Sequence, residues 1–99
     1  MNTECVRRYL RAAAELLPVD LAVDVKSLEQ SIGNGLPLRI AIASLAEKAS
    51  IVESMGEPGR YAQSDYAQIN KSVPLMYQAL YELVVARMGR SYLGGNDGL

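Results

Sequence analysis

The chain contains no histidine, no phenylalanine and no tryptophan, and it has a single cysteine. The absence of histidine removes the usual general base near neutral pH and the commonest metal ligand. No acidic or cysteine cluster has the spacing of a metal site, and no glycine-rich turn matches a phosphate-binding loop. The sequence therefore predicts no catalytic residue, no cofactor and no metal, and it argues against an enzyme.

The lone cysteine, Cys5, excludes an intrachain disulfide, so the fold does not need an oxidising compartment. Because Cys5 lies beside the apolar face of the first predicted helix, we expect a small buried thiol. The N-terminal region lacks the apolar run of a signal peptide, and no segment approaches the roughly 18–20 uninterrupted apolar residues of a membrane span. We expect a cytoplasmic protein without a membrane partner.

The chain also has no large excess of positive or negative charge, since ten basic and eleven acidic residues give a formal net charge of −1. This balance favours neither phosphate-backbone binding nor binding to anionic membranes. The chain has 99 residues, of which 49% are hydrophobic, as is ordinary for one globular domain. Without Phe or Trp, the core must be built from Leu, Ile, Val, Ala and Met, which suits helices.

Four segments have the apolar spacing of helices, over about 3–17, 18–32, 37–55 and 64–88. The first three carry the apolar lines Val6, Leu10, Ala13, Leu17; Leu21, Val25, Leu28, Ile32; and Leu38, Ile42, Leu45, Ala49, Val52. Pro18 and Pro37 are placed to begin helices, and Gly33-Asn34-Gly35 supplies residues that tolerate positive φ. The valines at 19, 23 and 25 could suggest a strand, which we reject because no partner strand appears.

The sequence thus predicts an all-α fold, a compact up-and-down bundle of four helices. Residues 1–99 form one domain, and we expect its last segment, 90–99, to be a flexible tail after a helix end at Gly89. Residues 56–63 are expected to be the longest internal loop.

The segment 64–88 is apolar on nearly every side, and its main apolar line passes through Pro74 without losing register. That line is Tyr66, Ile69, Val73, Met76, Leu80, Leu83. We expect one long helix that is kinked at Pro74, although a break with Ser72 as a new N-cap remains open. Leu45, Met76 and Leu80 should be among the most buried side chains.

A second face of this helix, displaced by roughly a quarter turn, carries Tyr77, Tyr81, Val84 and Met88. A third face carries small residues that permit close helix approach, namely Ser72, Ala79 and Ala86. Three shorter helices cannot easily cover the second face as well, and tyrosine and methionine are enriched at protein interfaces. We predict that the Tyr/Met face binds a second copy of the chain or another protein; the alternative is that all of it is core.

The only local basic cluster is Arg7, Arg8 and Arg11 on the first helix. We expect exposed pairs of Glu4 with Arg8 and of Arg11 with Glu15, four residues apart. Arg7 and Arg11 repel each other unless an anion or an acidic partner sits between them. The cluster could therefore contact a partner, or bind a nucleotide or nucleic acid together with nearby tyrosines, although a solvated helix face is the simpler interpretation.

Together these features favour a small non-enzymatic interaction protein that acts as an adaptor, regulator or inhibitor of a larger partner and forms a homodimer through 64–88. Its size and lack of chemistry would fit a bacterial or phage accessory protein. The alternative is a nucleotide or nucleic-acid binding module that uses the arginine cluster. Salt distinguishes the two, because phosphate binding weakens steeply with salt and an apolar interface does not.

Overall fold

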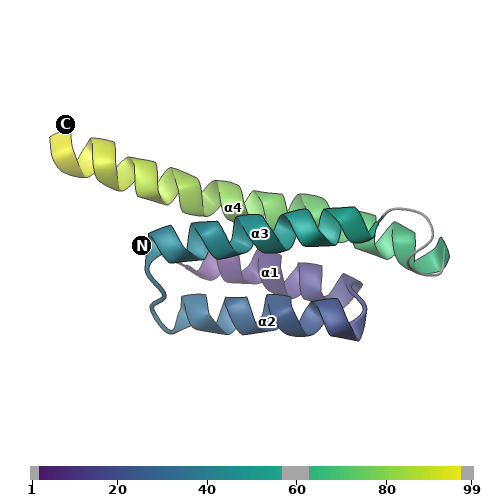
Figure 1. Cartoon of the computed structure of the whole chain (residues 1–99). Helices are drawn as coiled ribbons and strands as arrows, with labels where there is room; N and C mark the ends of the chain where they lie inside the picture. Colours follow the sequence, from purple (N-terminus) through teal and green to yellow (C-terminus); the bar gives the residue numbers. More distant parts are fainter. Residues whose placement is uncertain (1–2, 57–62, 97–99) are drawn as a thin grey trace.

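The computed structural model describes residues 3–56 and 63–96, which form four α-helices. They are α1 (Glu4–Leu16), α2 (Val19–Gly33), α3 (Leu38–Met55) and α4 (Gln63–Asn96). Consecutive helices run in opposite directions, as Figure 1 shows. The described residues contain no strand, so the predicted all-α, up-and-down bundle is confirmed, and residues 19–25 belong to a helix.

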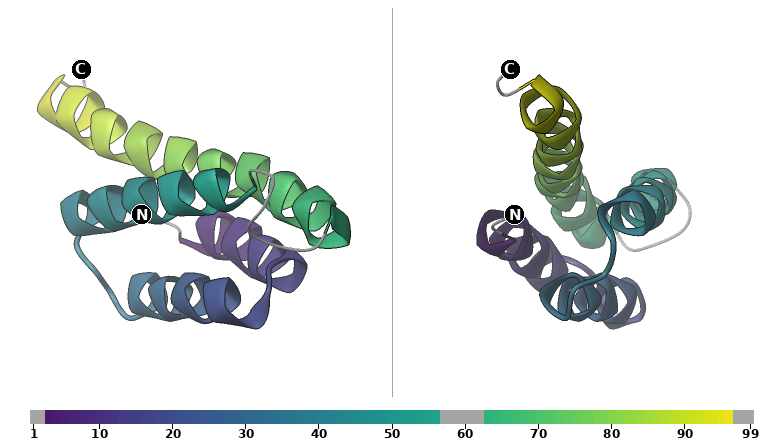
Figure 2. Two further views of the ribbon diagram at one scale, coloured as in Figure 1. Left: turned by 45° about the vertical axis from the view of Figure 1, so that its right-hand side comes forward. Right: turned by 90° about the vertical axis from the view of Figure 1, so that its left-hand side faces the viewer.

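The helix α4 packs against both α1 and α3, while α2 closes the other side of the bundle (Figure 2). Packing between α2 and α3 is the sparsest of the four helix–helix contacts. At a rise of about 1.5 Å per residue, the 34 residues of α4 span about 51 Å, which equals the longest dimension of the molecule. The C-terminal end of α4 consequently projects past the ends of the shorter helices.

The helix boundaries follow the chemistry of proline and glycine. Pro18 and Pro37 are the N-cap residues of α2 and α3, and each has a φ of −57°. The sequence predicted them at the first helical position, so each helix begins one residue later than predicted. The end of α2 is a Schellman motif, in which the Leu36 N–H donates to the Ser31 carbonyl and the Gly35 N–H to the Ile32 carbonyl. Gly35 has φ of +95°, a conformation in which a side chain would be strained, so the predicted positive-φ turn is confirmed there.

The core is made of Leu, Ile, Val, Met and many alanines, as the absence of Phe and Trp requires. All four members of the lines predicted for α1 and α2 are buried, as are Leu45, Ala49 and Val52 of α3. Six alanines are buried in this core: Ala13, Ala14, Ala22, Ala41, Ala49 and Ala79. Their small side chains let the helix backbones approach one another closely.

The orientation of α4 differs from the predicted one by a fraction of a turn. Ile69, Met76 and Leu83 are fully buried as expected, but Leu80 is only partly buried and packs against the edge of the core. The prediction that Leu80 is among the most buried side chains is therefore wrong. Ser72 and Ala79, which we assigned to a separate face, take the central positions instead. Small residues there allow α4 to pack closely on two helices at once.

Three further expectations about single residues can be compared with the structure. Helix α4 is continuous through Pro74, which decides against a break at Ser72, while the kink at Pro74 stays a prediction. It extends to Asn96, so the predicted helix end at Gly89 is wrong. Cys5 is exposed rather than buried, because it precedes Val6 and lies outside the buried line of α1.

Parts of two predicted segments cannot be compared with the fold. Of the predicted loop 56–63, residues 57–62 lie outside the described residues, and so do residues 97–99 of the predicted tail. Among the described residues, no helix combines the length and the apolar character needed to cross a bilayer.

The different burial of Leu80 and Leu83 predicts different costs of truncation. Leu83→Ala should lower the free energy of unfolding by about 2–5 kcal/mol, because it removes a fully buried side chain and leaves a cavity. Leu80→Ala should cost clearly less, since its side chain already contacts water. Urea unfolding followed by circular dichroism measures both, and equal losses would contradict the orientation of α4 described above.

Candidate interaction surface

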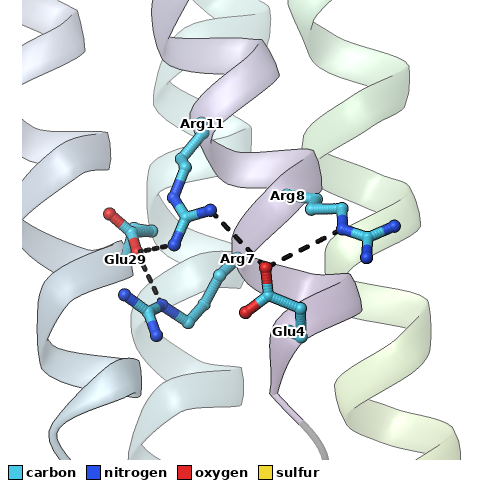
Figure 3. A network of polar contacts seen from close by, with 5 residues as sticks. All are labelled: Glu4, Arg7, Arg8, Arg11 and Glu29. Atoms are coloured by element: carbon cyan, nitrogen blue, oxygen red, sulfur yellow. Dashed lines mark hydrogen bonds and ion pairs between the residues drawn. The ribbon is translucent and has the colours of Figure 1, made fainter.

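The three arginines of α1 alternate with two carboxylates, Glu29 and Glu4. Figure 3 shows the sequence of contacts Arg7, Glu29, Arg11, Glu4, Arg8. Arg7 Nε donates to Glu29 Oε2 at 2.6 Å, and Arg11 reaches the same oxygen at 3.4 Å. Glu4 Oε2 lies 3.6 Å from Arg11 and 3.8 Å from Arg8. The acidic partner between Arg7 and Arg11 is thus Glu29, which comes from α2.

Glu29 is the buried member of this network, with only 7% of the residue exposed. A carboxylate at such a position needs a cation, and Arg7 supplies it while keeping 29% of its own side chain exposed. The Arg7 guanidinium also lies across Gly33, the last residue of α2, where an added Cβ would stand 2.7 Å from Cζ. A cation is favourable there, because the C-terminal end of a helix carries partial negative charge.

The network can be compared with the ion pairs expected from the sequence. It also gives the basic cluster a structural role, which is to neutralise the buried Glu29. The predicted ion pair between Glu4 and Arg8 is confirmed, whereas Arg11 contacts Glu4 and Glu29 instead of Glu15. The interpretation of the cluster as a solvated helix face fits Arg8, whose side chain is 76% exposed, but not Arg7. Since protein carboxylates already meet the charge of Arg7 and Arg11, the arrangement lends nucleotide binding no support, and that binding stays a hypothesis.

The Tyr/Met face of α4, consisting of Tyr77, Tyr81, Val84 and Met88, lies at the surface of the chain. Tyr81 is 61% exposed, Met88 50% and Tyr77 39%, and Val84 is half-buried. The alternative that these side chains all belong to the core does not fit Tyr81 or Met88. Val85, which we did not include, is also exposed and adjoins the face.

One member of the Tyr/Met face is fixed to the neighbouring helix. The Tyr77 hydroxyl donates a hydrogen bond of 2.9 Å to Glu53 Oε1 on α3. This bond to the carboxylate, followed by desolvation and by the negative charge of Glu53, raises the pKa of Tyr77 above its ordinary value of 10.0. The phenol is therefore held in one orientation beside α3, with its ring still partly exposed.

Sequence reasoning missed the two carboxylates that organise these sites. Glu29 could have been found, because it stands four residues after Val25 and three before Ile32, within the buried line of α2. A carboxylate at such a position requires a cation from another helix. Glu53 gave no such signal, because it lies at an exposed position of α3 and its contact with Tyr77 depends on how α3 and α4 pack.

A shallow recess lies between α2 and α3. Leu21, Asp24, Val25, Lys48, Ile51 and Val52 line it, and its cavity volume of about 30 Å³ is partly open to solvent. Pockets for small molecules usually enclose about 300–1,000 Å³. The recess is therefore too small and too open to bind such a ligand by itself.

Comparisons with known proteins identify no relative. No family model matches the sequence, and no curated protein and no solved structure matches the chain. The function is therefore inferred from the residues and the geometry of this chain.

The burial of Glu29 predicts that its arginine partner contributes to stability. Arg7→Met should lower the free energy of unfolding by about 1–3 kcal/mol, because a buried carboxylate loses its closest donor. Arg8→Met is the matched control and should change stability little, since Arg8 is exposed.

The double variant Arg7→Met, Glu29→Met should regain most of the loss, because no charge is then left buried. Urea unfolding measures the three variants. A loss of less than about half a kcal/mol for Arg7→Met would be within the range of ordinary surface changes and would contradict the role assigned to Glu29.

The raised pKa of Tyr77 predicts an alkaline effect on stability. The folded protein holds the phenol proton more tightly than the unfolded chain does. The hydroxyl therefore stabilises the fold below pH 10.0, and this contribution is lost as the pH rises through the raised pKa.

The absorbance of tyrosinate, taken as the difference between the wild type and Tyr77→Phe, isolates this titration. We expect a midpoint above the ordinary tyrosine value, and a lower midpoint when the difference is measured in a Glu53→Gln background. A Tyr77 midpoint that Glu53→Gln leaves unchanged would rule out Glu53 as the cause.

Proposed function

We propose that this protein is a small non-enzymatic interaction module that self-associates through the Tyr/Met face of α4. In this role it acts as an adaptor, regulator or inhibitor of a larger protein partner. The observation that supports the proposal is the exposure of aromatic and thioether side chains side by side on one helix, with Tyr81 and Met88 at least half exposed. Contiguous exposed apolar surface of this kind marks interaction sites in soluble proteins.

The position of the Tyr/Met face along α4 supports the same proposal. Leu83 is the last fully buried residue among the described side chains of α4, and Arg87, one turn further on the same side, is exposed. The side of the helix that faces the core at Leu83 thus carries an exposed cation one turn later. Met88 and Val85 stay apolar on a different side. These two residues do not continue the core, and a partner gives them a reason to be apolar.

The alternative of a phosphate-binding module has less support. Its residues would be Arg7, Arg8 and Arg11, and two of these already contact the buried Glu29. The proposal also includes a cytoplasmic setting, in which the exposed thiol of Cys5 would remain reduced.

Sedimentation equilibrium tests the self-association. The wild type should be a dimer at micromolar concentration, and Tyr81→Glu should be a helical monomer, because it places a charge in the middle of the apolar face. Gln68→Glu adds the same charge at an exposed position on the other side of α4 and should remain dimeric. A wild type that is monomeric at high concentration, or a dimeric Tyr81→Glu variant, would contradict the proposal.

A further inference from the structure

The exposed part of the Tyr/Met face is too small to hold a dimer by itself. Tyr77, Tyr81 and Met88 of this face are 39%, 61% and 50% exposed, and with the adjoining Val85, which is 43% exposed, they offer on the order of 400 Å² of surface. A stable interface buries about 800 Å² on each partner. If the proposed self-association holds, the second copy must also cover a neighbouring element.

The helix α3 provides this additional surface, because Glu53 on α3 contacts Tyr77 directly. An exposed line runs along α3 from Glu53 in steps of three and four residues, which keeps its members on one side of the helix. Its members are Arg39, Ala43, Ala46, Ser50 and Glu53, all exposed. We call these five residues the α3 line. It carries opposite charges at its ends and only small, uncharged side chains between them.

Both terminal charges of the α3 line lack an ionic partner among the side chains that the structure describes. Within residues 3–56 and 65–89, Arg39 has no carboxylate partner, and Glu53 has no cation. The Tyr77 hydroxyl donates to Oε1 of Glu53, so the second carboxylate oxygen of Glu53 can still form an ion pair with a cation. The two charges are 14 residues, or about 21 Å, apart along the helix.

The Tyr/Met face lies between these two charges. Because α3 and α4 run antiparallel and Gly56 lies against the Asn70 side chain, Ala46 is level with Leu80, ten residues back from Gly56 and ten forward from Asn70. Tyr81 lies next to that level, with Tyr77 and Val84 on either side of it. The midpoint of the α3 line is therefore level with the part of the Tyr/Met face around Tyr81, with Glu53 toward the Tyr77 end and Arg39 near Met88.

The geometry points to a second copy of this chain as the occupant, docked antiparallel across α3 and α4 about a two-fold axis near Ala46 and Tyr81. A two-fold axis at the midpoint of the α3 line brings Arg39 of each copy opposite Glu53 of the other. The pattern of charges is thus self-complementary in the antiparallel orientation, whereas a parallel arrangement would place like charges together. This inference rests on the proposed function and specifies its geometry.

Charge reversal tests the orientation. Arg39→Glu alone and Glu53→Lys alone should each weaken the dimer by about tenfold or more, because each puts two pairs of like charges across the axis. An equimolar mixture of the two variants should restore wild-type affinity as a heterodimer, since both pairs are then of opposite charge. Sedimentation equilibrium measures the dissociation constant of the dimer for each single variant and for their mixture. One variant carries a fluorescent label so that the heterodimer can be identified.

Matched controls separate this electrostatic effect from others. Lys26→Glu on α2 and Glu47→Lys on α3 make the same charge changes at exposed positions outside the α3 line and should leave the dimer intact. Glu53→Gln keeps an acceptor for Tyr77 and loses only the charge, so it should weaken the dimer less than Glu53→Lys does. Circular dichroism verifies that each variant is folded.

The outcomes distinguish the orientation from the proposed function. If the single variants dimerise like the wild type, or if the mixture fails to recover affinity, the antiparallel geometry is overturned. In that case a monomeric Tyr81→Glu variant would still support self-association through α4. A monomeric wild type would overturn both.

Discussion

The length of α4 is the constraint on which the other features depend. It has 34 residues, whereas α1, α2 and α3 have 13, 15 and 18. Three helices of at most about 27 Å cannot cover a helix of about 51 Å on all its sides. Of the described helices, α1 and α3 contact α4, so the bundle buries the line from Ile69 to Leu83 and leaves the Tyr/Met face, on another side of the helix, at the surface. The exposure of Tyr81, Val85 and Met88 on this helix is the feature on which the proposed self-association rests.

The bundle beneath α4 depends on a second constraint, which is the burial of a charge. Glu29 is the one charged residue among the described side chains that are buried. Its contact with Arg7 joins α1 to α2, and the guanidinium extends over Gly33 at the end of α2. Such a pair adds little net stability relative to apolar packing, but the wrong register between the two helices would leave the carboxylate buried without a cation. We therefore interpret the network as a device that selects the register of α1 on α2.

Local periodicity predicted much of the fold, because helices and their buried lines depend on residues three and four apart. The lines of α1 and α2 and the boundaries at Pro18 and Pro37 followed from the sequence for this reason. The rotation of α4 did not, since the choice between Leu80 and Ala79 as the central residue depends on how closely the neighbouring helices approach. The contacts of Glu29 with Arg7 and of Glu53 with Tyr77 join residues more than 20 positions apart. No short-range sequence pattern predicts such pairs, although the position of Glu29 in a buried line indicates that its carboxylate needs a cationic partner.

The contact of Glu53 with Tyr77 connects the architecture to association. Holding Tyr77 against α3 before a partner arrives reduces the conformational entropy that binding would otherwise cost. The same carboxylate defines one end of the α3 line, so in the proposed dimer its charge would act on the second copy while its hydrogen bond holds Tyr77 in place. Exposed ion pairs contribute little to affinity, but like charges opposed across an interface are costly. In such an interface the apolar residues of α4 supply most of the binding free energy, and Arg39 and Glu53 select the antiparallel orientation.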